Sequence, residues 1–356
     1  MIELTDQQIR NQILIEGLKA QEHLRFDSYL SQIDRLVRYR LSDEGDFIST
    51  KALLRQLLSD IKTGQLEIYD AYNAELLASI EALALDQSDF ASEALNIFLG
   101  DVTTPQVDRV VLGALRNNPM QIQDYNGEPL LNPFIRDLSE NQIGMIQTRI
   151  IQGYSQGQTT DQITRAIRGT RARRYQDGDL ARVKRSNRAL VFTTLQHAST
   201  QGRMSTYKKN SDILTGYQWV STLDNRTTTV CRSLDGNEYK FDKGPLPPLH
   251  LNCRSVTVPV VDKRYNLLSE LESARPSVGP NGAKEVKSSQ TYYGWLKTQP
   301  QAFQESAIGR DRAKLLRDGG LSADEFARLN LSKTFEPLTL EQMRAKRPEV
   351  FERASL

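Results

Sequence analysis

The stretch WVSTLDNRTTTVCRSLDGNEYKFDKGPLPPLHLNCRSVTVPV, residues 219–260, decides how the C-terminal third of the chain folds. In and around it, apolar and polar residues alternate in GYQWVSTLD, NEYKF and SVTVPVV, which predicts three short strands. Asp235-Gly236 precedes one of these alternating runs, and this dipeptide favours a tight hairpin turn. We therefore expect a small β-rich unit over residues 212–262.

The remainder of the chain carries apolar residues at three- and four-residue spacing, which is the period of amphipathic helices. Within residues 1–100 glycines interrupt this pattern at Gly45, Gly64 and Gly100, so we expect three or four helices joined by short loops. Four prolines break up residues 101–140, and the helical period returns after them.

These patterns predict a mainly α fold with a small α+β module. The N-terminal half should be elongated and helical, short strands should lie around 212–262, and the C-terminal tail should be helical. Residues 270–290 are rich in Pro, Gly, Ser and charge, which is typical of a linker. The predicted regions are a helical N-terminal region at 1–138, a module of helices followed by strands at 139–262, a linker at 263–290 and a helical tail at 291–356.

Seven aromatic side chains make the tail too apolar for a disordered segment. We expect them to pack in a core, and an interface with a partner is the alternative. They are Tyr292, Tyr293, Trp295, Phe303, Phe326, Phe335 and Phe351.

Composition limits the classes of function. Only 38% of the residues are hydrophobic and 25% are charged, which indicates an elongated molecule with much exposed surface. The net charge of +2 means that any contact with nucleic acid must be local. Two cysteines are too few for a disulfide framework and fit assembly in a reducing cytoplasm. No run of about 20 apolar residues is present, so we expect neither membrane insertion nor export.

Cys231, His250 and Cys253 are the candidate metal ligands. The His-x-x-Cys spacing lets a ring nitrogen and a sulfur approach each other. Three interpretations stay open. A structural zinc site would need a fourth ligand, such as Asp224 or Asp235. The two cysteines could instead form a disulfide, or remain buried thiols that stabilise the β fold together with a hydrogen-bonded histidine. Apart from a structural zinc ion, we expect no cofactor.

Residues 165–188 form the strongest charge run, with nine basic residues against Asp177 and Asp179. The run is either a solvated face or a contact with DNA or an acidic partner. No aromatic residues interleave in the pattern that base stacking would need, so sequence-specific binding is not expected. The basic residues are Arg165, Arg168, Arg171, Arg173, Arg174, Arg182, Lys184, Arg185 and Arg188.

A complete catalytic constellation is missing from the motifs. Neither a Gly-rich phosphate loop nor a Ser-His-Asp set can be assembled, so we expect no enzyme and no catalytic residues. The alternative is a metal-dependent nuclease built around His250. It would need a second histidine or a carboxylate cluster nearby, and the other histidines, His23 and His197, lie in predicted helices.

The order of motifs over about 140–262 resembles the phage Mu F-like minor head proteins, a family of phage head morphogenesis proteins. A strand with Trp is followed by Asp-x-Arg-Thr, by Cys-x-x-Leu-Asp-Gly and by Pro-Pro-x-His-x-x-Cys-Arg-Ser, and Val-Pro-Val closes the module. Relatives often carry further cysteines, one of them where this chain has Ser255. The matching positions are Asp224, Arg226, Thr227, Cys231, Asp235, Gly236, Pro248, His250, Cys253 and Arg254.

The resemblance implies a minor virion protein of a tailed bacteriophage, assembled in the host cytoplasm and located in the head or at the portal vertex. Its implied partners are the portal protein, the scaffold or the major capsid protein, and packaged DNA. The implied role is head assembly, with genome retention or delivery, in several copies per particle. A head-packaged nuclease and a scaffold-like factor absent from the mature particle are the alternatives.

Overall fold

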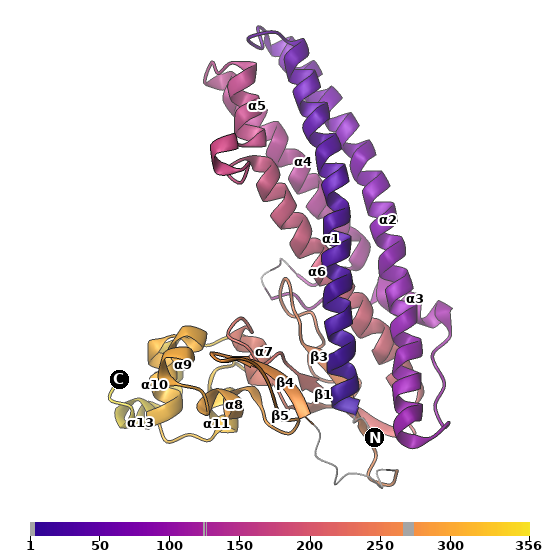
Figure 1. Cartoon of the computed structure of the whole chain (residues 1–356), viewed down its shortest axis with the longest axis vertical. Coiled ribbons are helices and arrows are strands. Elements are labelled where there is room, and N and C mark those ends of the chain that lie inside the picture. The colour runs from indigo at the N-terminus through magenta and orange to yellow at the C-terminus, as the bar shows by residue number, and fades with distance from the viewer. Residues whose placement is uncertain (1–3, 124, 126, 266–273) are drawn as a thin grey trace.

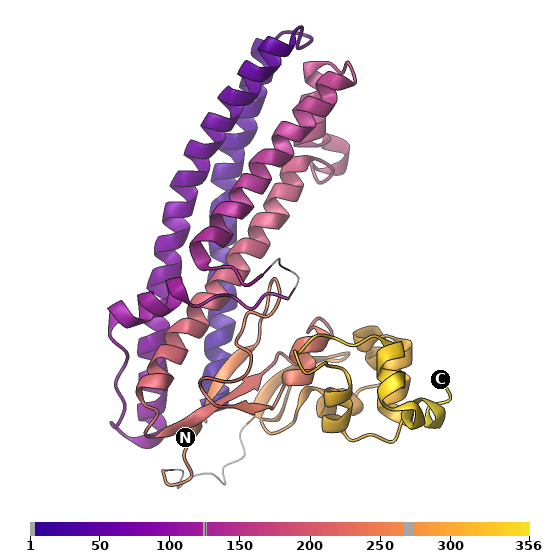
Figure 2. The same cartoon turned by 180° about the vertical axis from the view of Figure 1, so that it is seen from behind.

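The computed structural model describes residues 4–123, 125, 127–265 and 274–356. It is 63% helical with a few short antiparallel strands, which confirms the mainly α fold with a small β module. Long helices stand side by side in one elongated body, and the strands and the C-terminal helices form a second body at one end of it (Figures 1 and 2). Within the described residues, no helix is both long and apolar enough to span a membrane.

Four long helices build the elongated body, and three short segments connect or cover them. Helix α6 is the central element, because its residues from 190 to 207 are all buried and it contacts α1, α2, α3 and α4. The long helices are α1 (Leu4–Asp43), α2 (Lys51–Leu99), α4 (Leu131–Ser155) and α6 (Asp179–Lys209). The short segments are α3 (Asp108–Asn117), α5 (Thr160–Arg168) and the 3-10 turn η1 (Arg171–Arg173). Thr159 caps α5 in a capping box with Gln162.

The first hundred residues form two long helices, so the prediction of three or four was wrong. Gly64, taken as a break, lies inside α2. A Cβ atom there would come within 2.7 Å of Leu36 Cδ2 on α1. The glycine therefore marks a close approach between two packed helices and not a loop. Gly45 does lie between the two helices, at a positive φ of 70°.

The predicted strands form a three-stranded antiparallel sheet in the order β2-β1-β3. Strand β1 follows α6 after a short turn, and its Trp219 is opposite Thr257 of β3. A one-turn helix, α7, connects β1 to β2. The elements are β1 (Leu214–Val220), α7 (Thr229–Leu234), β2 (Glu238–Tyr239) and β3 (Val256–Val261).

The predicted linker differs from the structure. Its residues 266–273 lie outside the described residues, but β4 (Ala274–Gly279) and β5 (Gly282–Lys287) pair as a hairpin. The Pro280-Asn281 dipeptide, counted toward a linker, forms the two-residue turn, and Gly282 has a positive φ of 89°. Val278 donates its N–H to the carbonyl of Leu223, which docks the hairpin on the module.

The C-terminal tail is helical and has its own core. Tyr292, Tyr293 and Trp295 are buried, together with Phe326 and Phe351. Phe303 packs against the same core, and Phe335 packs against a neighbouring cluster, so the aromatic side chains serve mainly as core. The helices are α8 (Tyr292–Lys297), α9 (Gln301–Ile308), α10 (Arg310–Asp318), α11 (Ala323–Leu329), α12 (Leu340–Lys346) and α13 (Pro348–Arg353).

The contact between α2 and α6 depends on Gly202, where a Cβ atom would come within 2.2 Å of the carbonyl oxygen of Ala84. We expect Gly202→Ala to lower the free energy of unfolding by about 1–3 kcal/mol, because one helix backbone must move away from the other. The control is Gly17→Ala in α1, where a Cβ atom meets nothing within 4 Å. It should raise the free energy of unfolding by about 0.5–1 kcal/mol, since alanine is the better helix former. Equal effects in urea unfolding would contradict this packing.

Candidate functional site

Two elements of the β module bring Cys231, His250 and Cys253 together. Cys231 lies on α7, and the other two lie in the loop that leads into β3. The Cys231 sulfur is 3.1 Å from His250 Nε2 and 3.9 Å from the Cys253 sulfur. Both cysteines are free and buried, and the histidine is half-buried. The three ligand atoms all lie within 4.8 Å of one another.

Hydrogen bonds orient the histidine for a ligand role. His250 Nδ1 is 2.9 Å from the carbonyl oxygen of Leu251, so this nitrogen carries the proton and Nε2 offers a lone pair to the sulfurs. Burial raises the pKa of the Cys231 thiol. Burial also opposes ionisation of Cys253, but the bond to Cys231 and the proximity of His250 outweigh it and hold the pKa of Cys253 below the usual range.

The geometry fits a zinc ion with three protein ligands. Two sulfurs at about 2.3 Å from a tetrahedral zinc ion lie about 3.8 Å apart, and these two are 3.9 Å apart. A cavity of about 30 Å³ adjoins Cys231 and His250, which is about the volume of one water molecule. The expected fourth ligand was Asp224 or Asp235, but neither belongs to the group of ligand atoms found within the described residues. Solvent in the cavity is the remaining source of a fourth ligand.

Asp224 instead holds the chain together at the turn after β1. It accepts two hydrogen bonds from Arg254, at 2.7 and 3.0 Å, and one each from the backbone N–H groups of Arg226 and Thr227. Burial would raise the pKa of Asp224, but the bonds from Arg254 and Thr227 outweigh it and hold the pKa below its usual range. Four matching positions of the motif thus form one structural network.

Asp235 has a comparable role at the centre of the C-terminal body. Its side chain is fully buried and pairs with the buried Arg275, at 3.1 Å. It also accepts hydrogen bonds from the backbone N–H groups of Ser221 and Tyr292, both at 2.6 Å. Gly236 follows at a positive φ of 87°, and a Cβ atom there would approach Thr291 to 2.7 Å. Sequence reasoning missed the role of Arg275 and Tyr292 as partners of Asp235, although Gly-Pro-Asn-Gly is a turn signal that indicates a hairpin beside Arg275.

The nine basic residues cover α5, η1 and the first turns of α6. Seven are exposed, and Arg168 and Lys184 are half-buried. Lys184 pairs with Asp27 at 2.6 Å, Arg168 approaches Asp34 at 3.8 Å, and Arg182 approaches Asp179 at 3.6 Å. Arg188 donates to Asn252 and lies over the ring of Phe192. Six have no ion pair within the part of the chain that the structure describes: Arg165, Arg171, Arg173, Arg174, Arg185 and Arg188.

The other two histidines belong to the helical body. His197 is buried on α6, and its Nε2 lies 3.1 Å from the carbonyl oxygen of Leu115. Burial lowers the pKa of His197 to about 4, so it is neutral near pH 7. His23 lies on α1 and lines a cavity between α1 and α6. Among the described residues, Cys231, His250 and Cys253 are the one set of three or more potential ligands gathered closely enough for a metal ion.

The cluster predicts that the purified protein carries about one zinc ion per chain, because two sulfurs and an oriented imidazole nitrogen lie within 4.8 Å of one another. Cys253→Ser should lower the zinc content measured by mass spectrometry and also lower the midpoint of thermal unfolding. A chelator should destabilise the original protein and leave the variant unchanged. A metal-free protein that ignores the chelator would mean that the cysteines are simply buried thiols.

The network at Asp224 predicts a dependence of stability on pH. A carboxyl group whose pKa is lower in the folded chain than in the unfolded chain, about 3.9, stabilises the fold above that value and loses this effect as the pH falls through its folded pKa. Asp224→Asn should therefore be less stable than the original protein at pH 7, and the difference should shrink as the pH is lowered below about 4. Urea unfolding across this range measures it. Asp101→Asn, at an exposed position, is the control. A stability difference between Asp224→Asn and the original protein that stays constant with pH would contradict the stabilising role of the Asp224 carboxylate.

Comparison with known proteins agrees with the motif order. Residues 144–258 match the family model described as phage Mu protein F like protein, which confirms the resemblance. The match contains α6, strands β1 and β2, the first half of β3 and the Cys/His cluster. No curated protein and no solved structure is similar enough to count as a match. Residues 144–258 are thus similar to phage Mu protein F like proteins, and the functional class that this similarity indicates is bacteriophage head morphogenesis.

Proposed function

We propose that this chain is a minor head protein that sits at the portal vertex or on the inner capsid wall and acts in head assembly. The observation that carries the proposal is the structural role of the matching motif positions in residues 144–258. Asp224 and Asp235, two positions of the matching motif, are both engaged in intramolecular hydrogen bonds, so these motif positions stabilise the fold. A stable β module with a helical body on one side and C-terminal helices on the other suits a protein that connects other proteins.

The architecture supports a bridging role. The helical body extends away from the β module, and the C-terminal helices pack on the other side of that module, against α7. Exposed apolar side chains on α1, such as Ile13 and Leu14, leave contact surface near the sheet. The partners that we propose are the portal protein, the scaffold and the major capsid protein. Several copies per particle would follow from the symmetry of the head.

The nuclease alternative has little support. Hydrolysis of DNA by a metal ion needs carboxylate or histidine ligands around a site that is open to the substrate. The Cys/His cluster has two buried sulfurs, and the adjoining cavity of about 30 Å³ is too small for a nucleotide. Three protein ligands and one solvent molecule are also the pattern of catalytic zinc sites, but a cavity of this size leaves no room for a substrate. We therefore propose that a zinc ion here would stabilise the fold and that the protein is not an enzyme. A role in genome retention or delivery would rest on the basic residues of α5, η1 and α6.

Virion composition tests the proposal. We expect mass spectrometry of purified particles to detect the protein, and deletion of its gene to give heads that fail to mature or particles that infect poorly. The purified protein should not cleave DNA with added Mg²⁺, Mn²⁺ or Zn²⁺. Cleavage that is lost in His250→Ala would establish the nuclease. Presence in immature heads combined with absence from mature particles would establish a scaffold-like factor instead.

A further inference from the structure

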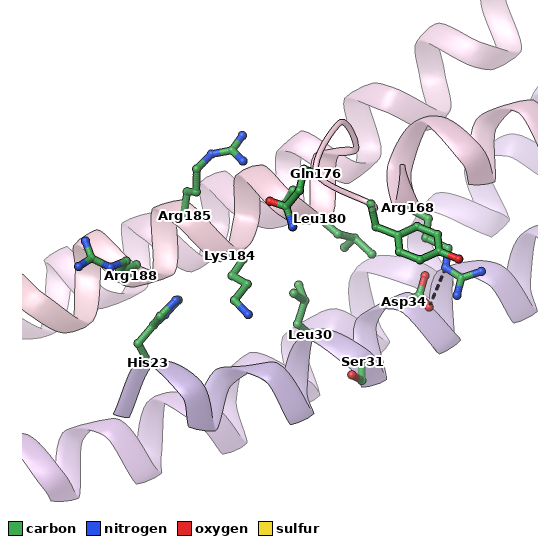
Figure 3. Close-up of a pocket in the computed structure, with 12 residues that line it drawn as sticks. His23, Leu30, Ser31, Asp34, Arg168, Gln176, Leu180, Lys184, Arg185 and Arg188 are labelled. Atoms are coloured by element: carbon green, nitrogen blue, oxygen red, sulfur yellow. Dashed lines mark ion pairs between the residues drawn. The ribbon is translucent and has the colours of Figure 1, made fainter. Parts of the chain in front are cut away.

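A cavity of about 380 Å³ lies between α1 and α6, where the segment from Arg168 to Gln176 borders one end (Figure 3). Lys184 extends from α6 toward α1, and His23 extends from α1 toward α6. Arg185 and Arg188 stand on α6 at the outer edge of the cavity. The cavity lies in the helical body and is distinct from the small cavity beside the Cys/His cluster.

The lining has an excess of positive charge. Arg168, Lys184, Arg185 and Arg188 contribute four cations, and Asp34 is the one carboxylate among the lining residues. Asp34 is already shared, because it pairs with Arg38 at 3.1 Å and approaches Arg168 at 3.8 Å. A concave surface lined by one sign of charge concentrates counter-ions of the other sign.

Two groups that line the cavity have hydrogen-bonding atoms without a partner in the described part of the chain. Arg185 makes no ion pair within the described residues, and its guanidinium offers a fork of N–H groups. Nδ1 of His23 is buried without a hydrogen-bond partner in that same part of the chain. Lys184 lies between them and shares its charge with the half-exposed Asp27. Oxygen atoms of an anion would accept hydrogen bonds from Arg185, and from Nδ1 of His23 when that nitrogen carries a proton.

The border of the cavity is held in a fixed shape. Asp177 accepts hydrogen bonds from the backbone N–H and the hydroxyl of Thr170, at 2.8 and 2.7 Å. Gly178 lies so close to Gly169 that a Cβ atom would come within 2.3 Å of its nitrogen. Arg168 stacks on Tyr175, 4.7 Å from the ring centre. Because this segment is ordered before any ligand arrives, binding costs less conformational entropy.

We propose that this cavity binds a backbone phosphate of double-stranded DNA, and that the exposed arginines of the adjoining turn contact the neighbouring phosphates. This inference rests on the proposed function for the source of the DNA. Arg171, Arg173 and Arg174 continue the positive surface from the cavity along η1. Contacts of this kind are electrostatic and independent of base sequence.

The surface favours DNA over an acidic protein. Protein interfaces depend on apolar and aromatic anchors at their centre. Between residues 165 and 188, Tyr175 is the one large exposed hydrophobic side chain, and it already stacks on Arg168. A row of unpaired cations without apolar anchors matches the regular charge of a phosphate backbone.

Salt-dependent binding to DNA tests the cavity. The full-length protein is titrated against a fluorescent duplex of random sequence at several salt concentrations. We expect Lys184→Gln/Arg185→Gln to weaken binding by about tenfold for each lost charged contact, and to lower the slope of log affinity against log salt by about one for each lost phosphate. The charge-preserving variant Lys184→Arg/Arg185→Lys should bind nearly as well as the original protein.

The control removes the same charge elsewhere. Arg310 and Arg328 are exposed on the C-terminal helices, and their change to Gln should leave the affinity within about twofold of the original. If the control and cavity variants lose the same affinity for DNA, the effect depends only on net charge, and the proposal is overturned. Polyglutamate that competes better than DNA at equal charge would point to an acidic protein partner and would also overturn it.

His23 gives a second measurement that needs no variant. The chain has three histidines, so their NMR signals can be assigned. Burial lowers the pKa of His23, and the charges of Lys184 and Arg188 on α6 lower it further, while Asp27 on α1 and a hydrogen bond to Asn187 oppose this. A phosphate in the cavity should raise the pKa of His23 and leave the buried His197 unchanged. No change at His23 with saturating DNA would place the binding elsewhere.

Virions separate this inference from the proposed function. If the cavity binds DNA and not an assembly partner, particles made with Lys184→Gln/Arg185→Gln should contain the protein in the usual amount. Failure of the variant alone to enter heads would mean that the cavity binds an assembly partner and not DNA. Absence of the original protein from heads would refute the head assignment, while DNA binding in solution would still be decided by the titration.

Discussion

The carboxylate of Asp235 is the constraint on which the C-terminal half of the molecule depends. A fully buried charge is stable only when donors surround it, and removing one partner of such a pair costs about 3–5 kcal/mol. The donors come from three separate segments: Ser221 after β1, Arg275 on β4, and the backbone N–H of Tyr292 at the start of α8. Arg275 also donates to the carbonyl oxygens of Ser221 and Gln290. The sheet, the hairpin and the C-terminal helices are therefore fixed around one charge.

Local patterns in the sequence were sufficient wherever local physics decides the structure. Alternation of apolar and polar residues predicted the three strands, and the structure contains all three. The errors arose where a distant partner decides. Gly64 could be taken as a break because Leu36, which needs the space, lies on another helix.

The candidate site divides in the same way. The His-x-x-Cys spacing and the upstream cysteine were sufficient to expect a cluster. In the structure, the segment between α7 and β3 brings His250 and Cys253 back next to Cys231 on α7. The roles of Asp224 and Asp235 could not be derived, since their partners Arg254 and Arg275 lie 30 and 40 positions away along the chain. Without those partners, both carboxylates remain candidate metal ligands on residue type alone. In the structure both carboxylates pair with these arginines.

Helix α6 connects the two candidate sites physically. The loop that carries His250 and Cys253 turns at Asn252, whose positive φ of 59° is one that asparagine tolerates better than most residues. Asn252 donates its backbone N–H to the hydroxyl of Thr193 on α6 and accepts a bond from Arg188, which lines the cavity between α1 and α6. The loop of the Cys/His cluster therefore fixes the position of a cation at the other site. Arg188 also lies over the ring of Phe192, so two contacts hold its guanidinium in place. The loop of the β module thus helps to position a side chain of the helical body.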